Sequence, residues 1–69
     1  MPEIKSAQEA TERALEFIKK YRPFVRPMKA VKSDDTWLVE IDVGPIATRI
    51  AKLKLDVKSG DILEYSIPD

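Results

Sequence analysis

Residues 51–65 have the sequence AKLKLDVKSGDILEY, and this stretch decides the fold because it has the pattern of a β-hairpin. Leu53, Leu55 and Val57 alternate with charged residues, as in a strand that buries one face and exposes the other to water. Gly60 can adopt the positive φ that a short chain reversal requires. We therefore expect two antiparallel strands joined by a turn.

The alternation continues in the return strand and assigns its residues to two faces. Leu63, Tyr65 and Ile67 fall on one face, and we expect Leu63 and Tyr65 to lie in the core. Ile62 and Glu64 fall on the other face, so we expect both side chains to point away from the core.

A helix is predicted at about 6–21. Ser6 and Glu9 have the spacing of a capping box, in which a hydroxyl and a carboxylate accept hydrogen bonds from amides of the first turn. Pro23 ends the helix because its ring cannot be accommodated in the helix interior. The apolar stripe that we expect to face a sheet consists of Ala7, Ala10, Ala14, Leu15, Phe17, Ile18 and Tyr21.

Two more strands are expected between this helix and the hairpin. Trp37, Val39 and Ile41 alternate with other residues and indicate a strand with one buried face. An earlier strand would lie at a sheet edge, because Pro27 cannot donate a hydrogen bond to a neighbour. The four expected strands span about 26–32, 36–43, 48–57 and 61–67.

Together these elements predict a single α+β domain over residues 1–69. It has two layers, with one N-terminal helix packed on a three- to four-stranded antiparallel meander sheet. Facing the helix stripe, the expected core residues of the sheet are Trp37, Val39, Ile41, Leu53, Leu55, Leu63 and Tyr65.

The composition excludes several kinds of chemistry. The chain has 69 residues, which suit one domain with a small core, and it contains neither cysteine nor histidine. Thiolate nucleophiles, imidazole bases and Cys/His zinc sites are therefore excluded. The paired acids Asp34 with Asp35 and Asp56 with Asp61 are explained by turn formation. We expect no catalytic residues, no metal and no cofactor, and interpret the protein as non-enzymatic.

The charges also guide the expected location. Twelve basic and twelve acidic residues cancel, so the net charge predicts no general attraction to polyanions. No apolar run is long enough to span a membrane, and residues 1–10 lack the apolar core of a signal peptide. We expect a cytoplasmic protein with no membrane contact. A charged fraction of 35% is compatible with a thermophilic protein, because charge networks become more useful as temperature rises.

Three motifs in order along the chain resemble the PepSY domain family. They are a helix of the form S-x-x-E-A-x-x-x-A-x-x-F, a strand W-x-V-x-I, and a K-L strand followed by S/T-G-x-I-L and an aromatic residue. The matching segments are 6–18, 37–41 and 53–65, which cover most of the chain. The resemblance implies a helix on an antiparallel sheet and a role in binding or restraining another protein, often a peptidase, without catalysis. We expect this chain to have no secretion signal, attached peptidase or membrane segment, which is where it departs from that family.

One candidate binding surface is an apolar row out of phase with the core. Leu38, Ile50 and Ile62 are expected on the outer sheet face, where branched side chains would suit a protein partner or a second copy of the chain. The ordinary explanations are scattered surface apolar residues, or a one-residue bulge that returns Ile50 to the core.

A second candidate surface is a basic segment that contains no acid, with Tyr21 and Phe24 interleaved. Such a segment suits nucleic acid, because cations neutralise phosphates and aromatic rings stack on bases. The ordinary explanation is a solvated helix end followed by an edge strand protected by lysines. Its cations are Lys19, Lys20, Arg22, Arg26, Lys29 and Lys32.

The leading interpretation is a small interaction or regulatory domain, similar to PepSY domains, that binds a protein partner or itself through its outer sheet face or a sheet edge. The alternative is a nucleic-acid contact module that uses residues 19–32. The sequence indicates no small-molecule substrate.

Overall fold

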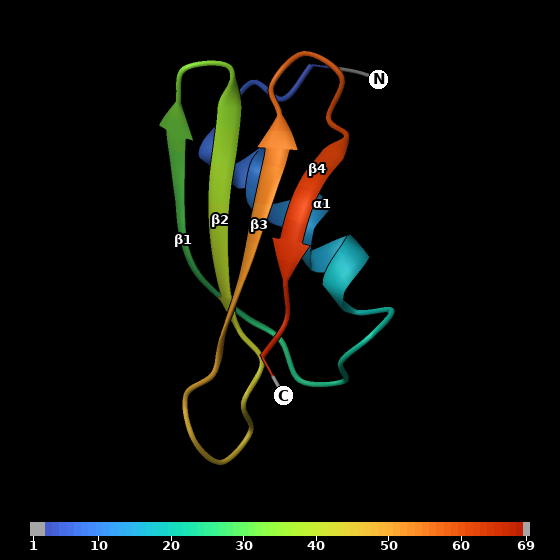
Figure 1. Cartoon of the computed structure of the whole chain (residues 1–69), viewed down its shortest axis with the longest axis vertical. Helices are drawn as coiled ribbons and strands as arrows, with labels where there is room; N and C mark the ends of the chain where they lie inside the picture. Colours follow the sequence, from blue (N-terminus) through green and yellow to red (C-terminus); the bar gives the residue numbers. More distant parts are fainter. Residues whose placement is uncertain (1–2, 69) are drawn as a thin grey trace.

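The computed structural model describes residues 3–68 and has one helix packed on one face of a four-stranded antiparallel sheet (Figure 1). The strands are adjacent in chain order, so the sheet is a meander. This confirms the predicted α+β arrangement. The elements are α1 (Ala7–Ile18), β1 (Arg26–Ser33), β2 (Thr36–Asp42), β3 (Ile50–Asp56) and β4 (Ile62–Ser66).

Helix α1 begins at the predicted cap. The Ser6 hydroxyl accepts a hydrogen bond from the Glu9 amide at 3.2 Å, and the Glu9 carboxylate accepts one from the Lys5 amide at 2.7 Å. The helix ends at Ile18, earlier than predicted, because the chain tightens there: the Tyr21 amide donates to the Ile18 carbonyl. Tyr21 is consequently half exposed rather than in the core.

The helix buries a narrower stripe than its sequence predicts. Ala10, Ala14 and Ile18 are buried, whereas Ala7 is exposed and Leu15 and Phe17 are partly buried at the margins of the core. Small side chains let a helix approach a sheet closely. Accordingly, α1 lies nearest to β1 and β2.

The centre of the core is formed by β2 and β3. Trp37, Val39 and Ile41 lie opposite Leu55, Leu53 and Ala51 respectively. All six side chains are buried on the helix side of the sheet. The alternation read from the sequence is therefore correct for both central strands. Ile4, Val43 and Val57 extend this core at its ends.

The phase predicted for β4 is wrong at its beginning. Leu55 pairs with Ile62 but Lys54 pairs with Glu64, so Leu63 is an extra residue in a β-bulge. The bulge places Ile62 against the core and leaves Leu63 exposed, the reverse of the expectation. Tyr65 pairs with Leu53 on the helix side, although about half of its surface remains exposed.

Strand β1 contains a matching irregularity at the opposite edge of the sheet. Pro27 pairs with Ile41 and Lys29 pairs with Glu40, so Met28 is the extra residue. A bulge next to Pro27 agrees with the edge position that the proline predicts, because neither feature fits an interior strand.

A buried carboxylate holds the loop between β2 and β3. Asp42 Oδ1 accepts hydrogen bonds from the Gly44 and Arg49 amides at 2.9 and 3.1 Å, and Asp42 Oδ2 is 2.9 Å from Arg26 Nη2. The two amide hydrogen bonds, followed by the Arg26 guanidinium, hold the pKa of Asp42 below its ordinary value of 3.8. The Val43 amide also donates to the Arg49 carbonyl, which closes the loop.

The turn between β3 and β4 is fixed in the same way. Asp56 Oδ2 accepts from the amide and the hydroxyl of Ser59 at 2.8 and 2.9 Å, and these bonds lower the pKa of Asp56. Gly60 has a φ of 78°, and its carbonyl accepts from Arg13 Nη1 at 3.1 Å. A Cβ on Gly60 would lie 2.5 Å from that nitrogen, so glycine permits the turn to contact α1.

Candidate functional site

The outer sheet face does not carry the predicted apolar row, although α1 leaves this face uncovered (Figure 1). Leu38 is exposed there and lies opposite Val31, which is also exposed. Ile50 is half buried opposite Asp42 at the end of the sheet, and Ile62 lies on the helix side because of the β4 bulge. Of the three predicted residues, Leu38 alone is exposed on this face, where it forms an apolar pair with Val31.

Charged residues occupy much of the remaining outer face. Glu40 lies between Lys29 and Lys52 on the neighbouring strands, and Glu64 lies opposite Lys54. Opposite charges at directly paired positions stabilise a sheet modestly. Here Glu40 and Lys54 are half-buried, and the other three charged residues are exposed. A shallow hollow of about 330 Å³ crosses β2, β3 and β4 on this face, and its lining residues are Leu38, Lys52, Leu53, Lys54, Glu64, Tyr65 and Ser66. This face therefore combines cross-strand charge pairs with a shallow, partly apolar hollow.

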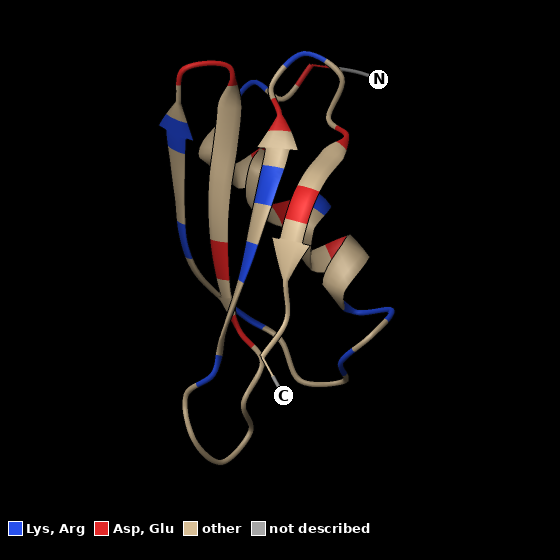
Figure 2. Cartoon of the chain, viewed as in Figure 1, with Lys and Arg blue, Asp and Glu red and all other residues tan. Residues whose placement is uncertain are grey.

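The six cations of the predicted basic segment are not gathered on one surface. Lys19 and Lys20 follow the end of α1, and Lys29 lies on the outer sheet face opposite Glu40. Lys32 lies at the far end of β1 opposite Trp37. Figure 2 shows basic segments at both ends of the molecule with acidic ones among them.

Two arginines of the segment have partners within the chain. The Arg26 guanidinium is bound to Asp42, and Arg22 donates to the carbonyls of Tyr21 and Pro68. The fold thus separates cations that are neighbours in sequence. Residues 19–32 therefore do not present all six cations on one surface.

The two sheet edges differ in their protection against pairing with another strand. An edge strand exposes unpaired amides and carbonyls, and proteins protect edges with proline, lysine and bulges. Strand β1 has all three, in Pro27, Lys29, Lys32 and the bulge at Met28. Strand β4 is short and bulged, but it has neither proline nor lysine, and its only charged residue is Glu64.

An aromatic cluster lies at the β4 edge. The rings of Phe17 and Tyr65 meet edge to face with centroids 4.9 Å apart, and Phe17 and Tyr21 are 5.3 Å apart. Tyr21 and Tyr65 stack at 6.3 Å. Both tyrosines are about half exposed, so the cluster forms part of the surface. The sequence assigned both tyrosines to the core, and the early end of α1 together with the edge position of β4 exposes them.

A hollow of about 260 Å³ lies next to this cluster, between α1 and β4. The hollow exists because α1 approaches β1 and β2 more closely than β4. Phe17 and Ile62 supply its apolar surface. The β3–β4 turn closes one end of this hollow, and there Arg13 donates its hydrogen bond to the Gly60 carbonyl. Its lining residues are Arg13, Glu16, Phe17, Lys20, Gly60 and Ile62.

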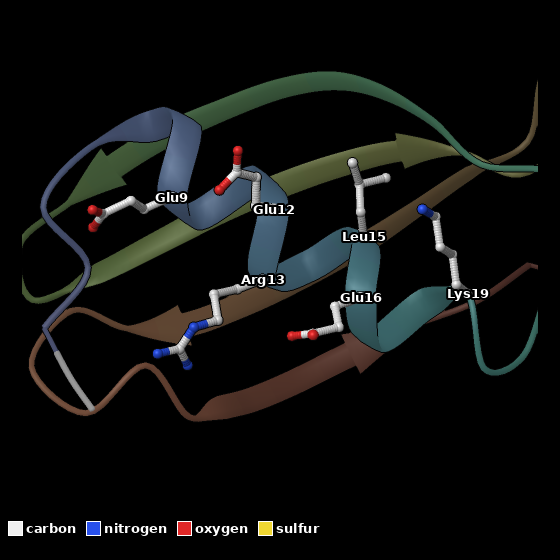
Figure 3. A pocket seen from close by; sticks show the side chains of 6 residues that line it. All are labelled: Glu9, Glu12, Arg13, Leu15, Glu16 and Lys19. Carbon is white, nitrogen blue, oxygen red and sulfur yellow. The ribbon is translucent and has the colours of Figure 1, made fainter.

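A larger hollow on the solvent side of α1 has no opposing wall. It measures about 510 Å³, and all six of its lining residues come from this one helical segment. In Figure 3, Arg13 extends toward the β3–β4 turn and Leu15 extends in the opposite direction, so these side chains do not converge on a ligand position. The hollow between α1 and β4 is the better candidate, because it has walls from two elements.

Other chemistry has little support among residues 3–68. In this part of the chain no three carboxylates come together as a metal site. Asp42 and Asp56 already accept hydrogen bonds within their own loops. The indole nitrogen of Trp37 is buried without a hydrogen-bond partner, but Trp37 lies within the core cluster.

Comparisons with protein-family models, curated proteins and solved structures find no match. Among the described residues, no helix is long and apolar enough to cross a membrane.

Proposed function

We propose that this chain is a small non-enzymatic interaction or regulatory domain that binds a protein partner along the edge of β4. The observation that carries the proposal is the difference between the two edges, because β4 lacks the proline and lysines that protect β1. Aromatic residues next to β4 add contact area of the kind that protein interfaces favour. The resemblance to PepSY domains implies the same kind of role.

The geometry favours a sheet edge over the outer sheet face. The outer face retains one exposed apolar pair among cross-strand charges, whereas Leu63, Tyr65 and Tyr21 are all exposed along the β4 side. Contiguous apolar and aromatic surface is the usual mark of a binding site. Nucleic-acid binding is less well supported, since the cations of residues 19–32 are dispersed or already paired.

The proposal is tested by affinity capture from the source organism with three forms of the protein. The first is the wild type, the second is Leu63→Lys with Tyr65→Lys, and the third is Met28→Lys with Val31→Lys. The third is a matched control at the other edge, because Met28 and Val31 are 49% and 44% exposed and Leu63 and Tyr65 are 55% and 51% exposed.

We expect one or more partners to bind the wild type and the β1-edge control but not the β4-edge variant. Lysines at the β4 edge should oppose strand pairing. Equal capture by both variants would contradict the proposal. Circular dichroism of each variant checks that the fold is retained.

A further inference from the structure

We infer that the β4 edge binds a lone extended segment of a partner protein, added to the sheet as a fifth strand beside the last turn of α1. This inference rests on the proposed function and deepens it, since it specifies what occupies the edge. The other occupant that the edge could receive is a second copy of this chain, through pairing of two β4 strands.

The position of α1 distinguishes these two occupants. In Figure 1 the C-terminal turn of α1 lies outside β4, beyond the edge of the sheet. The Phe17 and Tyr21 rings contact each other there, and both lie close to Tyr65 of β4. The end of the helix therefore overhangs the place that an added strand would occupy.

A second copy is disfavoured by this overhang. Two identical edges that extend one sheet pair in the antiparallel direction, about a two-fold axis perpendicular to the sheet. That symmetry leaves both helices on the same face, so the two overhanging helix ends would meet above the joint. A lone strand brings no helix of its own and avoids this crowding.

The surroundings of the edge also predict the character of the bound segment. Side chains of an added strand alternate between the two sheet faces. On the helix side they would meet the hollow next to Phe17 and Ile62 and the exposed rings of Tyr21 and Tyr65. On the outer side they would lie beside the charged pair of Lys54 and Glu64.

The expected ligand is therefore an extended segment with apolar residues at alternate positions and polar residues between them. The five residues of β4 limit the paired length to a similar number. Recognition would combine main-chain hydrogen bonds with side-chain contacts on the helix side, which is the usual division of roles in strand addition.

The test begins with selection of a random peptide library against the immobilised domain. Affinities of enriched peptides are then measured by fluorescence anisotropy. We expect enriched sequences to alternate between apolar and polar residues. Leu63→Lys with Tyr65→Lys should weaken binding by at least about tenfold, and Met28→Lys with Val31→Lys should change it by less than about twofold.

Methylation of backbone amides at alternate peptide positions should abolish binding in one register only, because alternate amides face the β4 edge.

Nuclear magnetic resonance and sedimentation equilibrium separate the remaining outcomes. Peptide-induced shifts confined to β4 and the end of α1, in a monomeric protein, support the inference. A dimer that Leu63→Lys with Tyr65→Lys dissociates would overturn it, because a second copy would then occupy the edge, and the proposed use of the edge would survive.

The absence of any peptide ligand, with edge-dependent capture of a natural partner, would also overturn the inference alone, because the partner would then present a folded surface. Peptide binding that depends on Met28 and Val31 instead would overturn both the inference and the proposed function.

Discussion

Asp42 shows how one residue organises a loop. By the alternation of β2, its side chain belongs on the outer sheet face, opposite Ile50. Only 1% of its surface is nevertheless exposed. Two backbone amides and the Arg26 guanidinium compensate for the burial of its charge. The Gly44 amide is near Asp42 in sequence, but Arg26 and Arg49 are brought to it by the fold, so the alternation of β2 does not indicate that Asp42 is buried.

The stability of the protein should fall in acid partly because of Asp42. The pKa of Asp42 is lowered in the folded state, so its ionised form stabilises the fold at neutral pH. This contribution should be lost as the pH falls below about 5 and toward the folded-state pKa. Urea unfolding of wild type and Asp42→Asn at about pH 7 and about pH 3 measures the effect.

Asp42→Asn should be less stable than wild type at neutral pH and should lose less stability on acidification. Asp56, whose pKa is also lowered, should leave part of the acid dependence in this variant. If the variant and the wild type lost the same free energy of unfolding between about pH 7 and about pH 3, Asp42 would not contribute to the acid dependence.

At the scale of elements, local patterns explain the helix start and the two central strands. The cap at Ser6 depends on residues three apart, and the alternation in β2 and β3 depends on residues two apart. The phase of β4 depends on a neighbour that is distant in sequence, whereas the end of α1 depends on a local hydrogen bond that the apolar pattern does not reveal. Leu63 is displaced by pairing with β3, and Tyr21 is exposed because the helix tightens after Ile18.

The N-terminal cap provides a prediction at this scale. Ser6→Ala should destabilise the protein by about 0.5–2 kcal/mol, because the Glu9 amide loses its hydrogen-bond acceptor. Urea unfolding gives this difference. Ser66→Ala, an exposed position at the end of β4, is the matched control and should change stability by less than about 0.5 kcal/mol. Equal losses in the two variants would argue against the cap.

At the scale of the whole molecule, the helix divides the sheet into a buried face and an open face. Ile41 and Leu38 lie on the same strand but on opposite faces, with Ile41 fully buried and Leu38 exposed. The total free energy of unfolding is expected to be small, at about 0.05–0.15 kcal/mol per residue. The loss of one buried side chain is therefore a large fraction of it.

Truncation of these two residues should therefore have very different effects. Ile41→Ala should cost about 2–5 kcal/mol, through lost burial and an unfilled cavity. Leu38→Ala should change the free energy of unfolding by less than about 0.5 kcal/mol. Thermal and urea unfolding provide the comparison, and similar losses in both variants would contradict the assignment of the faces.

The sequence by itself determined the fold class, the helix cap and the buried faces of β2 and β3, because each depends on residues a few positions apart. Only the tertiary structure decided the candidate site. Strand pairing introduced the bulges at Met28 and Leu63, and the sheet order placed β4 at an unprotected edge. The course of α1, from behind β1 and β2 to a last turn beyond β4, brought Phe17, Tyr21 and Tyr65 together beside that edge (Figure 1). These relations join residues up to 48 positions apart, and no local period specifies them.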